Sequence, residues 1–254
     1  MKTIFETSLF RDKCYNPELG YPFTEINKET ISEMESSTPQ KTYDNILIIL
    51  DNGHGENTPG KRSPDGKFRE YKFCREMVQA ISEGLSTLGI PSVILVPEEK
   101  DISLSERVRR VNEIYDSNKD KIVFLISVHN NAAGNGSTWM SARGWSCYTS
   151  KGTTESDIIA KDLYVAAENI VGPKVLRKFN GDKKPDWEEN FTILTKSKCP
   201  AVLTENFFQD NHQDVDYLTS ESGFADVLNI HIEGIKTFLR NKKAIDFFKI
   251  IIKI

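Results

Sequence analysis

The sequence lacks the features that mark several large classes of protein. No stretch of its 254 residues approaches the roughly 18 consecutive apolar residues that span a bilayer. Its four cysteines form no CxxC pair, which argues against a zinc ribbon or a disulfide scaffold and predicts reduced, partly buried thiols. The formal charge of −4 gives no basic footprint for nucleic acid. We therefore expect neither a transmembrane segment nor a nucleic-acid partner.

The composition that remains is that of an ordinary globular chain. Hydrophobic residues make up 38% and charged residues 28%, which argues against a largely disordered chain, a collagen and a coiled coil. Residues 1–43 read as an N-terminal extension, residues 44–241 as the main domain, and residues 242–254 as a hydrophobic and basic tail. The tail is expected to be an edge strand or a packed helix, with a membrane-surface contact or an oligomer interface as alternatives.

The main domain alternates apolar runs with segments of helical periodicity. The alternation predicts an α/β fold: a single domain with a mostly parallel or mixed central sheet, flanked by helices on both faces. The polar stretch 174–190 is expected to be an irregular surface loop. Strands are predicted at 46–50, 92–96, 122–128, 144–149 and 201–204, and helices at 70–88, from 103 onward, at 158–171 and at 224–239.

Four polar stretches lie where predicted strands end or where a predicted helix begins. They contain His54 between two glycines, Glu70 at a helix start, His129 after the most apolar strand, and Glu205 after a late strand. Because ligands of open α/β sheets bind at the carboxyl edge of the strands, these side chains are expected to converge there. Read singly, each histidine is more simply a hydrogen-bonded structural residue, so the argument depends on the set.

Two histidines and a carboxylate form a standard catalytic zinc set, with the fourth position open for water. A zinc-bound water has a pKa of about 7, and a nearby carboxylate can accept its proton. His54 and Glu70 are 16 residues apart, and the helical HExxH arrangement is absent. A catalytic zinc site built from separate strand ends is therefore the prediction.

Taken together, the stretches resemble the zinc-dependent N-acetylmuramoyl-L-alanine amidases of the Amidase_3 type, which cleave peptidoglycan. That family has a strand-borne Asp-Pro-Gly-His-Gly, a Glu that opens a helix, a Ser-x-His-x-Asn-Ala and a late strand Glu. The matching residues here are 51–55, Glu70, 127–132 and Glu205, and the helix signature at 104–109 also looks like the family's. The similarity covers roughly residues 45–239.

The resemblance implies a role for each matching residue. His54, Glu70 and His129 would bind Zn²⁺, and Glu205 would be the catalytic carboxylate that takes a proton from water and returns it to the departing amine. Asn131 matches the asparagine beside the second histidine and is a lesser site candidate. Asn52 stands where proline is usual, which is expected to change the stiffness of the loop and no ligand.

Further residues are weaker candidates for contacts with substrate. Trp187 is the best of three tryptophans that could stack on sugars, the others being Trp139 and Trp145, although aromatic residues more often pack. Arg69 belongs to a basic loop that either attracts the carboxylates of stem peptides or is merely solvated. The two remaining histidines are expected to be structural, His212 at a helix entry and His231 on the final helix.

The resemblance implies a peptidoglycan substrate and hydrolysis of the amide between the lactyl group and L-alanine. Two alternatives stay open, a zinc peptidase or deacylase that acts on soluble muropeptides and a non-catalytic wall-binding module. The N-terminal residues show no apolar core of a secretory signal. We therefore expect synthesis in the cytoplasm and action on the cell wall after release by another factor, as for a phage or prophage endolysin. The oligomeric state is not predicted.

Overall fold

The computed structural model describes residues 43–178 and 185–252, with side chains described as far as residue 242. The chain divides into two units, 1–41 and 42–254, and all described elements belong to the second. The predicted N-terminal extension and Cys14 lie outside the described residues, apart from Tyr43. Among the described helices, none is long and apolar enough to cross a membrane.

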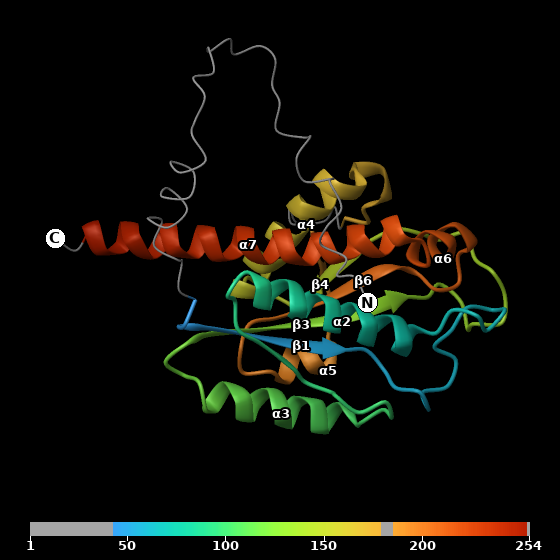
Figure 1. The fold of residues 1–254 in the computed structure, drawn as a ribbon, viewed down its shortest axis with the longest axis horizontal. Coiled ribbons are helices and arrows are strands. Elements are labelled where there is room, and N and C mark those ends of the chain that lie inside the picture. The colour runs from blue at the N-terminus through green and yellow to red at the C-terminus, as the bar shows by residue number, and fades with distance from the viewer. Residues whose placement is uncertain (1–42, 179–184, 253–254) are drawn as a thin grey trace, which may run out of the picture. The chain divides into compact units, whose positions relative to one another are not determined.

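A six-stranded mixed sheet forms the centre of the second unit (Figure 1). The strand order is β2-β1-β3-β6-β4-β5, in which β1, β2, β3 and β6 are parallel while β4 runs antiparallel to β6 and pairs in parallel with β5. The predicted mixed sheet is thus confirmed. The strands are β1 (Ile46–Asn52), β2 (Ser92–Ile94), β3 (Ile122–Asn131), β4 (Ser146–Thr149), β5 (Trp187–Glu188) and β6 (Ala201–Phe208).

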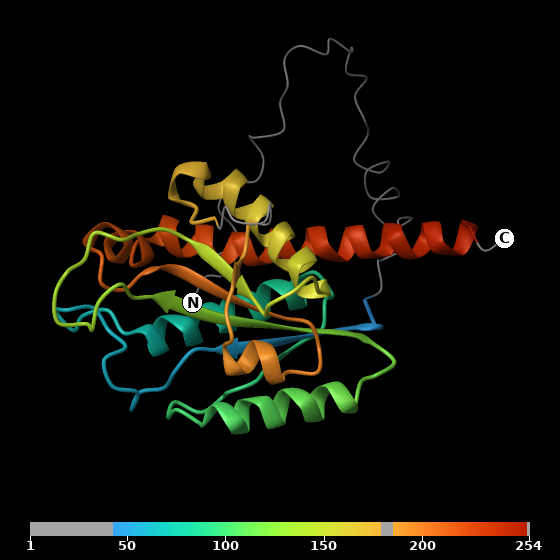
Figure 2. The same cartoon turned by 180° about the vertical axis from the view of Figure 1, so that it is seen from behind.

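Helices cover both faces of the sheet, as Figures 1 and 2 show. The helices α2, α4 and α7 pack on one face, and α3 and α5 pack on the other. The helices are α2 (Glu70–Thr87), α3 (Leu104–Asp116), α4 (Glu155–Val171), the short 3₁₀ turn η3 (Pro173–Val175), α5 (Thr192–Lys196), α6 (His212–Leu218) and α7 (Glu221–Ile252).

The apolar run of β1 matches a sheet that helices cover on both faces. Ile48 and Leu50 lie in the hydrophobic cluster on the α2 and α7 face, while Ile49 lies in the cluster on the α3 face. A strand buried on both faces needs apolar side chains at successive positions, which explains the continuous run rather than an alternating one. The three described cysteines, Cys74, Cys147 and Cys199, are free and buried, as predicted.

The structure extends several predicted elements. β3 continues past His129 to Asn131, and β6 continues past Thr204 to Phe208, so that His129 and Glu205 lie within strands rather than after them. Residues 174–190 are not wholly irregular, because Trp187 and Glu188 pair with β4 as β5. The last helix, α7, runs through residue 242, where the sequence suggested a separate tail.

Candidate active site

Gly53 and Gly55 place His54 at the end of β1. A Cβ on Gly53 would lie 2.5 Å from the imidazole of His129, and a Cβ on Gly55 would lie 2.0 Å from the backbone nitrogen of Asp101. Both positions therefore exclude any side chain. His54 itself has a φ of 60°, a left-handed conformation that is rare outside glycine. The tight turn lets the imidazole of His54 face His129 on the neighbouring strand β3.

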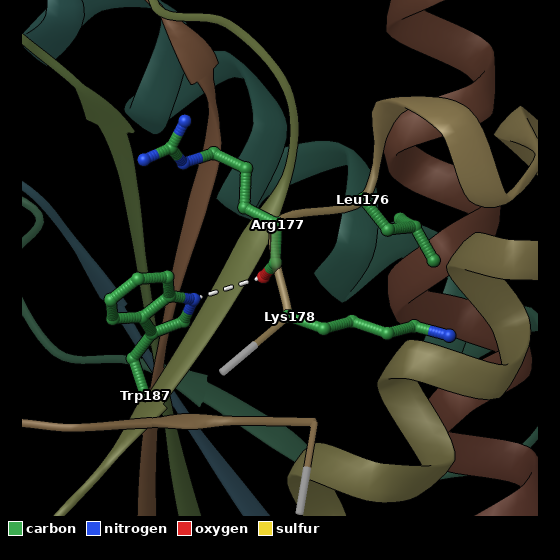
Figure 3. Close-up of a pocket in the computed structure, with 4 residues that line it drawn as sticks. All are labelled: Leu176, Arg177, Lys178 and Trp187. Atoms are coloured by element: carbon green, nitrogen blue, oxygen red, sulfur yellow. Dashed lines mark hydrogen bonds between the residues drawn. The ribbon is translucent and has the colours of Figure 1, made fainter. Parts of the chain in front are cut away.

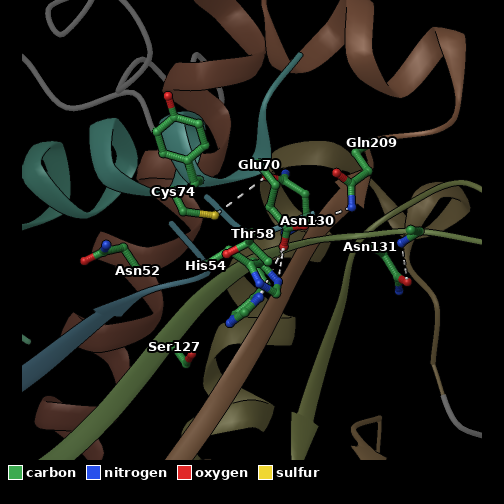
Figure 4. Close-up of polar contacts among 12 residues, drawn as sticks. Asn52, His54, Thr58, Glu70, Cys74, Ser127, Asn130, Asn131 and Gln209 are labelled. Carbon is green, nitrogen blue, oxygen red and sulfur yellow. Dashed lines mark hydrogen bonds and ion pairs between the residues drawn. The ribbon is translucent and has the colours of Figure 1, made fainter. Parts of the chain in front are cut away.

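Glu70 is the first residue of α2 and is buried, with a relative exposure of 0%. Its Oε1 accepts a hydrogen bond of 3.1 Å from the backbone N–H of Asn130 on β3. Its Oε2 accepts one of 2.9 Å from Nε2 of Gln209, just after β6 (Figure 4). The carboxylate is thus held from two sides. Gln209 carried no signal in the sequence, because the contact spans 139 positions.

His129 and Glu205 lie opposite each other on β3 and β6. Beyond this pair, β6 advances to Phe208 while β3 advances only to Asn131, which is a bulge of one extra residue in β6. Phe207 within the bulge has a φ of 62°. The register therefore brings Glu205 beside a predicted metal ligand, and its Oε2 is buried with no hydrogen-bond partner in the part of the chain that the structure describes.

The structure brings His54, Glu70 and His129 into one group, with a donor atom from each within 4.8 Å of the others. Glu70 Oε1 lies 3.4 Å from His54 Nε2 and 3.2 Å from His129 Nδ1. Donors about 2.1 Å from zinc in a tetrahedral arrangement are about 3.4 Å apart. The donor types and these two separations fit the ion that the sequence predicts.

Burial and the neighbouring charges shift the pKa values of the group in different directions. Burial lowers the pKa of His54, which favours the neutral form that binds metals. Burial alone would raise the pKa of Glu70. The hydrogen bonds and charges of the two histidines outweigh burial and lower the pKa, so the carboxylate is ionised. Burial raises the pKa of Glu205 to about 7. The two carboxyl groups therefore have different environments, one suited to binding a cation and one to exchanging a proton.

Arg107 on α3 holds the loop that carries His54. The guanidinium is buried, and it pairs with Oδ1 of Asp51 at 2.5 Å and with Asp101 at 2.8 Å. It also donates to the backbone oxygens of Asn52 at 2.7 Å and His54 at 3.2 Å. The helix signature at 104–109 contains this residue, but its role follows only from the fold.

Asp51 and Asn52 are the last two residues of β1, and their side chains differ in their hydrogen bonds. Asp51 receives both Arg107 and the hydroxyl of Ser127, the latter at 2.6 Å. Asn52 is fully buried, and neither polar atom of its amide has a hydrogen-bond partner among the described residues. Asn52 is the last residue of β1 and lies directly before the loop whose stiffness it is expected to change.

The weaker candidates are dispersed. Asn131 ends β3, its Oδ1 accepts the N–H of Ala132, and its side chain also interacts with the Tyr148 phenol. Arg69 is exposed at the N-cap of α2, next to Glu70 in the chain but outside the group of His54, Glu70 and His129. Trp187 lies on β5, on the far side of β4 from Glu205.

The other tryptophans and histidines pack against other side chains of the protein. Trp145 is fully buried and donates to Asn206 at 2.8 Å, so it is a core residue and cannot stack on a sugar. Trp139 stacks on His212, the first residue of α6, with ring centroids 3.6 Å apart. His231 is buried on α7, as predicted for a structural histidine.

Sequence comparison agrees with this geometry. Residues 48–237 match the family described as N-acetylmuramoyl-L-alanine amidase. The endolysin of Bacillus phage SPP1 is 26% identical over 199 residues, which cover 78% of this chain and 67% of that protein. The N-acetylmuramoyl-L-alanine amidase CwlM of Bacillus licheniformis is 24% identical over 208 residues, which cover 81% of this chain and 74% of that protein.

Solved structures share the fold. An N-acetylmuramoyl-L-alanine amidase from Clostridium difficile 630 superposes with a TM-score of 0.65 and 24% identity, covering 78% of this chain and 98% of that chain. The catalytic domain of the CD27L endolysin, which targets Clostridia difficile, superposes with a TM-score of 0.56 and 18% identity, covering 76% of this chain and 97% of that chain. At these identities the likeness is one of fold.

Proposed function

The chain belongs to the N-acetylmuramoyl-L-alanine amidase family, and from that membership we propose a zinc hydrolase in which Glu205 is general base and acid. The bond cleaved is the amide between the lactyl group of N-acetylmuramic acid and the L-alanine of the stem peptide in peptidoglycan. One observation carries the proposal. His54, Glu70 and His129 form a compact donor group, and Glu205 faces His129 across the neighbouring strand.

His54, Glu70 and His129 would hold the ion through two imidazole nitrogens and one carboxylate oxygen. When bound, zinc supplies a Lewis acid that lowers the pKa of water to about 7 and polarises a carbonyl oxygen. Gln209 and the backbone N–H of Asn130 orient the carboxylate of Glu70. Arg107 and Arg75 fix the turn at His54 by donating to its backbone oxygen at 3.2 and 3.0 Å.

Glu205 is suited to the proton transfers because its Oε2 is buried and has no hydrogen-bond partner among the described residues. In the reaction the oxygen of a water molecule bonds to the lactyl carbonyl carbon, and the bond from that carbon to the alanine nitrogen breaks. Glu205 takes a proton from the water and delivers it to the departing nitrogen. The products are a muramoyl carboxylate and a peptide with a free L-alanine amine.

The biological setting that we propose is an endolysin-like one, in which another factor releases the enzyme to the cell wall. The similarity to the endolysin of Bacillus phage SPP1 supports this setting. The proposal predicts that cells producing the chain lyse only when their membrane is permeabilised. Lysis without permeabilisation would contradict it.

The reaction is tested with purified peptidoglycan, zinc-loaded enzyme and mass analysis of the released products. Free stem peptides that begin with L-alanine are expected. Shortened peptides would indicate the zinc peptidase alternative. Split glycans would contradict the amidase mechanism, and intact wall that retains the bound protein would indicate a binding module.

A further inference from the structure

Arg177 is a cation that has no role in the proposed reaction. It lines a pocket of about 440 Å³ together with Leu176, Lys178 and Trp187 (Figure 3). Figure 3 shows the guanidinium of Arg177 over the strands, whereas the ammonium of Lys178 points the opposite way. Lys178 pairs with Glu168 at 2.7 Å. Within the described part of the chain, by contrast, no carboxylate forms an ion pair with Arg177.

The backbone of Arg177 is fixed against the sheet. Its N–H donates to the oxygen of Trp145 at 2.8 Å. Its oxygen accepts from the hydroxyl of Tyr164 at 2.7 Å and from Nε1 of Trp187 at 3.0 Å. Gly144 permits the close approach, because a Cβ there would lie 2.2 Å from the oxygen of Val175. A rigid backbone of this kind presents its side chain at a defined place.

The side chain of Arg177 reaches back toward the strand that carries Glu205. Its guanidinium carbon lies 5.1 Å from the ring centroid of Phe208, which is the last residue of β6. The backbone N–H of Arg177 bonds to Trp145, the residue before β4, and β4 is the strand next to β6. The charge is therefore held on an aromatic face near the carboxyl end of β6.

Tyr148 lies on β4, the strand beside the one that carries Glu205. It lies on β4 opposite Leu203, two positions before Glu205, and therefore on the same face of the sheet as Glu205. Trp187 and Phe191 flank its ring, with centroids 6.3 and 5.5 Å away. Burial and the charge of Glu205 raise the pKa of Tyr148, while Arg177 lowers it, so both charges act on one phenol.

We propose that Arg177, with the aromatic surface of Tyr148 and Trp187, forms a subsite that binds a carboxylate of the stem peptide near the scissile amide. A planar guanidinium binds a carboxylate through paired hydrogen bonds. The guanidinium of Arg177 has no acidic partner within the described chain. The aromatic rings provide an apolar wall for the peptide backbone and side chains. The inference rests on the proposed amidase function and adds selectivity for the acid form of the peptide.

Two synthetic substrates test the subsite. One is N-acetylmuramoyl-L-alanyl-D-glutamate, and the other is the same compound with both carboxylates converted to carboxamides. The wild-type enzyme is expected to prefer the acid by about 10-fold or more in kcat/KM, the range typical of a lost charge-assisted hydrogen bond. Arg177→Gln is expected to lose that preference by slowing the acid only, and Arg177→Lys to keep part of it.

Lys174→Gln is the matched control, because Lys174 is an exposed cation three positions before Arg177. It is expected to keep the wild-type preference. Zinc content and the unfolding midpoint of each variant show that the site and the fold are intact. Equal losses on both substrates in Arg177→Gln, or no preference in the wild type, would overturn the subsite alone. Failure of the wild type to cleave either compound would overturn the amidase proposal as well.

Discussion

Gln209 and Glu70 are 139 positions apart in the chain, and Nε2 of Gln209 donates to Oε2 of Glu70 over 2.9 Å. The other carboxylate oxygen of Glu70 lies near both histidines of the donor group. Gln209 therefore leaves one oxygen of Glu70 for a metal and occupies the other. A contact of this type fixes the orientation of a ligand and raises metal affinity.

Gln209→Ala is expected to weaken zinc binding by about 10- to 100-fold while the protein stays folded. Removing the amide frees Oε2 of Glu70 and lets the carboxylate rotate. Competition with a chelator of known affinity measures the change. Gln79→Ala on the exposed face of α2 is the control, since its amide bonds to the exposed Glu83 and lies outside the donor group. Equal zinc affinity in wild type and Gln209→Ala would contradict this role.

Glu205→Gln is expected to reduce the release of stem peptides by about 10²- to 10⁴-fold, because an amide cannot accept the proton of water. Zinc content should stay the same, since Glu205 is not part of the donor group. Glu76→Gln, a half-exposed carboxylate on α2, should keep full activity. Turnover at the wild-type rate in Glu205→Gln would exclude the assignment of this residue as general base.

Arg107→Met is expected to lower the free energy of unfolding by about 3–5 kcal/mol, because it leaves Asp51 buried without its charge partner. Arg109→Gln is the comparison, since the ion pairs of Arg109 with Glu106 and Glu113 lie at the surface and their loss should cost less than about 1 kcal/mol. Urea denaturation measures both values. Similar small losses in the two variants would show that Arg107 does not anchor the turn.

His231 is expected to make stability depend on pH. Burial lowers its pKa from 6.5 to about 4, so the unfolded chain binds the proton first as the pH falls. Stability is therefore lost as the pH falls below 6.5 and levels out below 4, by about 3 kcal/mol in total.

His231→Gln keeps a side chain that can hydrogen-bond Thr204, the partner of His231 Nε2 at 3.0 Å, and it does not titrate. The free energy of unfolding is measured for both proteins between pH 7 and pH 4. Wild type should lose about 3 kcal/mol more than the variant over this range. Parallel pH profiles would rule out a contribution from His231.

Much of the site could be predicted from local sequence. His54, Glu70, His129 and Glu205 are recognisable because each follows or interrupts a pattern of apolar residues, and such patterns fix the strands and helices. The bounds of β3 and β6 were harder to predict. β3 runs past its last apolar residue, Val128, and β6 runs through a polar stretch to Phe208, because hydrogen bonds between the two strands continue across the bulge.

The sequence by itself determined the α/β class, five of the six strands and the residue types at the donor group. Only the tertiary structure decided that Gln209 orients Glu70, that Arg107 fixes the turn at His54, and that Arg177 lies over Phe208. Each of these contacts joins segments far apart in the chain or on separate strands. Their formation depends on strand order and register, which arise from packing of the whole sheet and leave no local pattern.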